Sequence, residues 1–161
     1  MADENQQPAQ QFALQRIYIK DLSFETPQGH EVFRQAWKPR VNLEMNTRHN
    51  RIDEQNFEVV LTLSVTAALE EKTAFLAEVQ QAGVFFMSGM PEAQQRQVLG
   101  TVCPNILFPY AREAVDNLVV RGSFPPLMLA PVNFDALYTQ ALKQAEEKAK
   151  AEQLPETPAQ H

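Results

Sequence analysis

The segment Phe57-Glu-Val-Val-Leu-Thr-Leu-Ser-Val-Thr-Ala67 carries the clearest strand pattern in this chain. From Phe57 to Val65, every second residue is apolar, and most of the residues between them are polar. Successive side chains of a β-strand point to opposite faces, so this pattern predicts a strand with one buried and one polar face. We therefore expect a sheet at the centre of the fold.

A tight turn at Glu70 and Glu71 leads from this strand into a second alternating segment, residues 73–81. Short connections favour antiparallel pairing, because parallel strands need a long crossover. Residues 41–45 alternate in the same way and predict a short strand before the central one. Within 73–81, the alternating sets are Phe75, Ala77 and Val79 on one side and Leu76, Glu78 and Gln80 on the other.

Residues 12–25 are rich in residues that favour strands, and they predict the first strand of the sheet. A strict two-residue period divides its side chains into two sets, one of which contains the leucines and aromatic residues. The other set is mixed, because it joins carboxylates to isoleucines. The first set is Leu14, Tyr18, Leu22 and Phe24; the second is Gln15, Ile17, Ile19, Asp21, Ser23 and Glu25.

The second half of the chain is predicted to be helical. Pro91 fits the first turn of a helix, and the helical pattern runs to Gly122. Pro104 and Pro109 lie inside this segment, which is therefore either two helices or one kinked helix. Asn133 is expected to cap a last helix. Strands followed by helices indicate an α+β fold, with a four-stranded antiparallel sheet and C-terminal helices packed on one face.

The chain has 161 residues, enough for one domain with its own hydrophobic core. We expect this domain at residues 12–143, between a disordered segment at 1–11 and a frayed or disordered acidic tail at 144–161. The formal charge of −6, without a basic run, argues against nucleic acid and anionic membrane surfaces as partners. We find neither a secretory signal nor an apolar run of the roughly 18 residues that cross a bilayer.

The residues that usually carry chemistry form no catalytic pattern. Cys103 is the single cysteine, which excludes an internal disulfide and fits a reducing cytoplasm, and its apolar neighbours predict a buried thiol. The three histidines are scattered, so we expect no metal site. The five glycines form no phosphate-binding motif, so we expect no nucleotide cofactor and no enzyme activity.

Two surfaces each leave two interpretations open. Asp21 and Glu25 lie four residues apart on one strand face, which is either a solvated face or an acidic docking surface for a basic partner. Phe33, Trp37 and the apolar connector at residues 124–129 either fold back on the core or line an open apolar groove.

Two further segments resemble the signatures of the SecB family, the bacterial protein-export chaperones. They are Cys103-Pro-Asn-Ile-Leu-Phe-Pro-Tyr-Ala-Arg-Glu113 and Leu129-Ala-Pro-Val-Asn-Phe-Asp-Ala-Leu137. Residues 16–25 and 75–81 match the same family in order and spacing, so the resemblance extends over residues 12–142. It implies a cytoplasmic homotetramer, built as a dimer of dimers, that holds unfolded precursor proteins without ATP. It also implies transfer of these precursors to SecA, the motor ATPase of the translocase.

The resemblance assigns roles to individual positions. The zinc-binding C-terminal tail of SecA would dock on one face, and the zinc belongs to SecA, so this chain needs no metal or cofactor. An alternative is an α+β small-molecule binding domain or enzyme with a pocket between sheet and helices, which requires a group with a shifted pKa. The implied positions are Asp21, Glu25, Leu76 and Glu78 for SecA docking, Ala77, Val79 and Gln81 for the tetramer interface, and Phe33, Trp37, Leu127, Leu137 and Tyr138 for the client groove.

Overall fold

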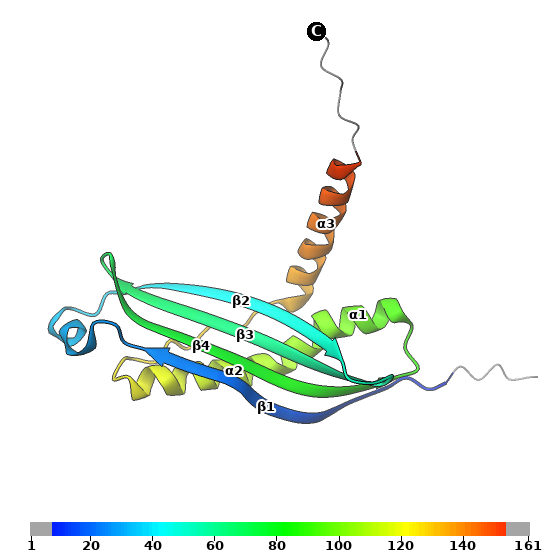
Figure 1. Cartoon of the computed structure of the whole chain (residues 1–161), viewed down its shortest axis with the longest axis horizontal. Helices are drawn as coiled ribbons and strands as arrows, with labels where there is room; N and C mark the ends of the chain where they lie inside the picture. The colour runs from blue at the N-terminus through cyan, green and yellow to red at the C-terminus, as the bar shows by residue number, and fades with distance from the viewer. Residues whose placement is uncertain (1–7, 154–161) are drawn as a thin grey trace, which may run out of the picture.

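The computed structural model describes residues 8–153, and its centre is a four-stranded antiparallel sheet (Figure 1). The strand order β1-β4-β3-β2 places the first and second strands at the two edges. The helices follow the sheet in the chain, which confirms the predicted fold class. The strands are β1 (Gln11–Glu25), β2 (Arg40–Arg51), β3 (Asn56–Leu69) and β4 (Lys72–Ser88).

The hydrophobic core lies between one face of the sheet and the long helix α2 (Val102–Arg121). On β3, the alternating set from Phe57 to Val65 is buried, as its pattern predicted. Antiparallel pairing aligns this set with the buried set of β4; Leu63, for example, lies opposite Val79. We call this the helix-covered face, and we call the opposite, more polar side the outer face.

Two strands extend further than their patterns predicted. β2 continues through polar residues to Arg51, and β4 continues to Ser88. β2 is an edge strand, so its backbone pairs with β3 along its whole length while its side chains remain largely exposed. Hydrophobic periodicity therefore marks only the part of β2 whose side chains reach the core.

The predicted division of β1 into two faces is wrong in its middle, because two register shifts interrupt the strand. The shifts lie between Leu14 and Arg16 and between Ile19 and Asp21. Each shift inserts an extra residue, which reverses the alternation of the residues that follow. Tyr18 therefore belongs to the outer face, opposite Ala82, while Ile19 belongs to the helix-covered face, opposite Gln81. Ile17 joins Ile19 on the helix-covered face, opposite Gly83.

The long connection between β1 and β2 contains a short 3-10 helix, η1 (Gly29–Arg34). Val32 of this helix is buried in the core, whereas Phe33 is 53% exposed. Figure 1 places η1 at the end of the sheet opposite α1 (Glu92–Gly100). The connection is thus folded onto one end of the molecule.

The segment between Pro91 and Gly122 forms two helices rather than one kinked helix. α1 ends at Gly100, and the chain turns at Thr101, whose hydroxyl donates to the carbonyl oxygen of Gln97 at 2.7 Å. α2 begins at Val102, with Pro104 in its first turn. The backbone N–H groups of a first turn have no partner within the helix, so the N–H that proline lacks costs α2 no hydrogen bond. Pro109 lies inside α2, which continues past it to Arg121.

The last helix, α3 (Phe134–Glu152), begins at the predicted cap, because the Asn133 side chain accepts a hydrogen bond from the backbone N–H of Ala136 at 3.0 Å. It leaves the sheet and projects away from it (Figure 1). The chain is helical across the predicted domain boundary at residue 144, and the side chains of 144–152 are exposed. Of the predicted terminal segments, residues 8–11 and 144–153 are described, with β1 beginning at Gln11 and α3 ending at Glu152. Disorder at residues 1–7 and 154–161 stays a prediction, because these residues lie outside the described part.

Candidate functional site

The predicted docking residues come together on the outer face, at the end of the sheet where β1 finishes. Register places Glu25 opposite Leu76 and Ser23 opposite Glu78. Asp21 is the next residue of β1 on this face, opposite Gln80. Carboxylates from two adjacent strands thus flank Leu76, whose side chain is 37% exposed. The arrangement offers negative charge around one apolar contact, which suits a basic segment with an apolar residue.

A shallow depression of about 190 Å³ lies within this group, lined by Glu25, Leu76 and Glu78 among others. Ser64 of β3 also lines it, and its hydroxyl donates to the Glu78 carboxylate at 3.0 Å. Ser64 was expected on the polar side of β3, but no residue pattern connected it with Glu78. The contact follows from cross-strand pairing, because Ser64 lies directly opposite Glu78.

A second polar group occupies the same face further along the sheet. Lys20 donates to the Glu58 carboxylate at 2.7 Å, and the Tyr18 hydroxyl donates to its other oxygen. The hydrogen bonds from Lys20 and then from Tyr18 lower the pKa of Glu58. Burial, followed by the bond to Glu58, raises the pKa of Tyr18 to about 12. No residue pattern predicted this group, because it forms only when the bulges of β1 bring Tyr18 to this face.

The aromatic residues of the η1 connection pack on the end of the core. The Trp37 ring lies 5.0 Å from that of Phe124 and 6.2 Å from that of Phe75, measured between ring centroids. Phe33 also contacts Phe124, at 5.3 Å, and keeps about half of its surface exposed. Phe124 is buried and Trp37 is half-buried against it, so these two residues fold back on the core, while Phe33 keeps exposed apolar surface. An open groove at this end of the molecule stays a prediction.

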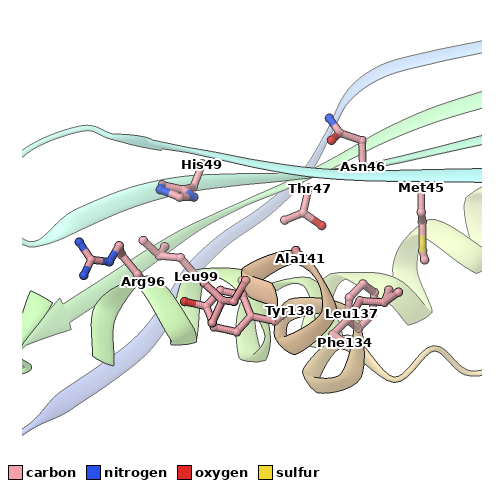
Figure 2. Close-up of a pocket in the computed structure, with 12 residues that line it drawn as sticks. Met45, Asn46, Thr47, His49, Arg96, Leu99, Phe134, Leu137, Tyr138 and Ala141 are labelled. Atoms are coloured by element: carbon pink, nitrogen blue, oxygen red, sulfur yellow. The ribbon is translucent and has the colours of Figure 1, made fainter. Parts of the chain in front are cut away.

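An open cavity of about 560 Å³ lies between β2, α1 and α3 (Figure 2). Leu137 and Tyr138 of the predicted client groove line it from α3. Met45 and Thr47 point into it from β2, whereas Asn46 points away (Figure 2). Its walls are mainly apolar, with His49 and Arg96 as polar groups at one end (Figure 2). The sequence pattern did not predict that β2 forms one wall of this cavity. The alternation of apolar residues that ends at Met45 indicated an apolar face of this strand and could have pointed to it.

Four of the five predicted groove residues therefore divide between two places, and the fifth lies on the segment between them. Leu137 and Tyr138 line the cavity, while Phe33 and Trp37 belong to the aromatic group around Phe124. Leu127 lies on the connector between α2 and α3, half-buried against the core. The connector, residues 122–133, leads in the chain from Phe124 to Phe134 and thus joins the two places.

The three predicted interface residues, Ala77, Val79 and Gln81, are buried at 2%, 0% and 3% exposure. They lie on the helix-covered face of β4, the strand on which α2 packs. The Gln81 amide donates to the backbone carbonyl of Tyr18 at 3.1 Å, beside the second bulge of β1. In this single chain they are core residues, so they can affect an interface only through the elements packed on them.

Residues 8–153 contain no group of three or more histidine, cysteine, aspartate or glutamate side chains placed to hold a metal ion. Over the same residues, no helix is both long and apolar enough to cross a membrane. Burial raises the pKa of the Cys103 thiol to about 12, so this cysteine is a poor nucleophile in the folded protein.

Comparison with known proteins gives one consistent family. The family model described as preprotein translocase subunit SecB matches residues 4–145. The protein-export protein SecB of Marinobacter nauticus is 60% identical over 151 residues, covering 93% of this chain and 90% of that protein. Its counterpart from Hahella chejuensis is 56% identical over 154 residues, covering 94% and 96%.

Among solved structures, the fold is similar to the SecB-like chaperone Rv1957 of Mycobacterium tuberculosis, solved in complex with a ChAD peptide from an antitoxin. The two chains superpose with a TM-score of 0.64 at 20% sequence identity. The match covers 75% of this chain and 90% of that one. At this identity the likeness concerns the fold alone.

Proposed function

Because this chain belongs to the SecB family and is a protein-export chaperone, we propose that it binds unfolded precursor proteins in the cytoplasm and delivers them to SecA. One structural observation carries the proposal: the two faces of the sheet differ in chemistry. Apolar sites lie beside the helix-covered face, and a carboxylate-flanked leucine lies on the outer face. Separate faces allow client and SecA to be bound at the same time.

The client sites are the aromatic group with Phe33 and Trp37 and the cavity beside Tyr138. An unfolded chain exposes apolar side chains that a folded protein buries, so such sites select the unfolded state rather than a particular sequence. Binding to that state draws the folding equilibrium away from the native form without ATP. Phe33, at 53% exposure, and Leu137, at 43%, supply accessible apolar surface at the two places.

The SecA site is the outer-face group of Asp21, Glu25, Leu76 and Glu78. The partner is the zinc-binding C-terminal tail of SecA, whose metal stays with SecA. Charge around Leu76 would attract the tail and set its orientation, while the leucine would supply the apolar contact. Their proximity across β1 and β4 supports this assignment.

The assembly is a homotetramer made of two dimers, with residues 12–143 as the chaperone domain. Apolar residues exposed on the helix-covered face of the edge strand β1 support self-association. Ala77, Val79 and Gln81 would contribute by holding α2 and β1 in position. Several grooves on one tetramer raise the avidity for a long client by roughly 10² to 10⁴. The apolar residues of β1 are Phe12, Leu14, Ile19 and Leu22.

A small-molecule enzyme is not favoured, because the family consists of chaperones. The cavity is open, and the groups with shifted pKa values lie elsewhere: Tyr18 and Glu58 on the outer face, Asp53 between β2 and β3, and Cys103 in the core. None of these residues lines the cavity.

The decisive experiment measures refolding of a denatured secretory precursor with and without the purified protein, in the absence of ATP. Light scattering on the same sample gives the mass. A tetramer that delays refolding is the expected result. A monomer or dimer without effect on refolding would contradict the proposal and return attention to a small ligand in the cavity.

A further inference from the structure

Met128 is the most exposed large apolar side chain of the described residues, at 77%, and it lies in the middle of the connector between α2 and α3. Its backbone has a φ of 50°, in the left-handed region. That region is unfavourable for residues other than glycine, asparagine and aspartate. The position therefore combines an unfavourable backbone with an unfavourable exposure of a long apolar side chain.

Two side chains of α2 hold the connector in this conformation. The Asp116 carboxylate accepts hydrogen bonds from the backbone N–H of Leu127 at 2.9 Å and from that of Met128 at 3.3 Å. Arg112, one helical turn earlier, donates to the carbonyl oxygen of Leu129 at 3.5 Å. The backbone groups of three consecutive residues are thus bound to one helix.

The neighbours of Met128 show which way its side chain is directed. Leu127 and Leu129, on either side of it, pack partly against the core, while Met128 does not. Because the backbone is held at all three positions, Met128 cannot turn inward without breaking these hydrogen bonds. Strain that the surrounding structure maintains is characteristic of functional positions.

We propose that Met128 is a contact residue for the unfolded client and that Asp116 is the residue that positions it. This inference rests on the proposed function. The occupant is an apolar segment of a client that passes between the two client sites, because the connector joins Phe124 of one to Phe134 of the other. A methionine suits varied clients, since its unbranched, polarisable side chain adapts to differently shaped apolar partners.

The test uses reduced and carboxymethylated α-lactalbumin, which cannot refold, as the probe, and measures its affinity by titration calorimetry. Met128→Asn removes the apolar side chain and keeps a residue that accepts the left-handed backbone. We expect affinity to fall about five- to tenfold, with an unchanged or higher unfolding temperature. Ile52→Asn is the matched control, because Ile52 is 54% exposed in the connection between β2 and β3.

A double-mutant cycle separates positioning from general stability. Asp116→Ala should lower the affinity for the probe when Met128 is present and should change it little in the Met128→Asn background. Asp116→Asn keeps one acceptor oxygen, so it should retain part of the affinity that Asp116→Ala loses. Equal losses in both backgrounds would overturn the positioning role.

Wild-type affinity in Met128→Asn, or an equal loss in Ile52→Asn, would overturn the contact role while leaving the proposed function intact. Failure of the wild-type protein to bind the probe would overturn both.

Discussion

Gly100 and Tyr138 are in such close contact that no side chain fits between them: a Cβ atom on Gly100 would lie 2.7 Å from Cδ2 of the tyrosine ring. Gly100 is the last residue of α1, and Tyr138 lies near the start of α3. Both line the cavity beside β2. Beyond Tyr138 the side chains of α3 are exposed, so this contact helps to set where α3 leaves the body of the protein.

Gly100→Ala should displace α3 and change the cavity. Alanine favours a helix by up to about 1 kcal/mol over glycine, and forced packing costs about 1–3 kcal/mol. Since α3 can move outward, we expect global stability to change by less than about 1 kcal/mol. Hydrogen exchange of the amides at residues 137–143 should become faster, and client affinity should fall.

The control for this substitution is the double variant with Tyr138→Ala, which removes the ring that the new methyl group would meet. Gly100→Ala should then leave exchange in α3 unchanged. Faster exchange regardless of the ring would show that the contact does not position α3.

Reversing charge at Asp21 or Glu25, as Asp21→Lys or Glu25→Lys, should weaken binding of the SecA tail and leave client binding intact. Each removes an attraction and adds a repulsion beside Leu76, which we expect to reduce affinity about tenfold at low salt, and less at high salt. Calorimetry with a tail peptide loaded with zinc and, separately, with an unfolded client measures both. Glu54→Lys, in the exposed connection between β2 and β3 at the opposite end of the sheet, is the charge-matched control. Equal loss of both ligands in a tetrameric variant would contradict separate sites.

Trp37→Ala should weaken client binding while the tetramer persists. The indole stacks on Phe75, contacts the tilted ring of Phe124 and is half-buried, so its removal also destabilises the fold, by about 2–3 kcal/mol. Trp37→Phe retains an aromatic contact and should recover most of the stability and part of the affinity. Light scattering and binding of an unfolded client provide the measurements, and unchanged client affinity in Trp37→Ala would remove this residue from the client site.

Stability should depend on pH through Tyr18 and Glu58 at both extremes. The pKa of Tyr18 is raised from 10.0 to about 12, so the unfolded chain ionises first and stability falls as pH rises from 10 towards 12. The pKa of Glu58 is lowered from 4.5, so its contribution is present above pH 4.5 and is lost as pH falls through the lower pKa of the folded state. Urea unfolding measures the free energy of unfolding of the wild type, Tyr18→Phe and Glu58→Gln across these pH ranges. Tyr18→Phe should lack the loss of stability at high pH, and Glu58→Gln should lack the loss at low pH. Parallel curves for all three would refute the assignment.

Cys103 should be inert towards thiol reagents in the native protein. Its side chain is buried at 0% exposure, and burial raises its pKa to about 12, so almost no thiolate forms near pH 8. We expect labelling to be on the order of a hundredfold slower than in urea-unfolded protein. Mass spectrometry of timed samples follows the reaction. Similar rates in native and unfolded protein would mean that the core around α2 opens readily.

Strand periodicity located β3 and the start of β4 because each of these central strands has one buried, apolar face and one more polar face. The same reasoning failed in β1, where two bulges move Tyr18 and Ile19 to faces that strict alternation does not predict. A bulge is a property of two paired strands, so no pattern within 12–25 reveals it. The extension of β2 to Arg51 was missed for a related reason, since pairing with β3 supports an edge strand whatever its side chains.

The order of strands and helices, the cap at Asn133, the burial of Cys103 and the family all followed from residue types and local spacing. Such features depend on nearest neighbours in the chain, which is why a single sequence contains them. Contacts between distant segments were decided by tertiary packing: Ser64 on Glu78, Asp116 on the backbone of Met128, and Gly100 on Tyr138. Each depends on the register or crossing of two elements, which is determined only when the whole core has packed.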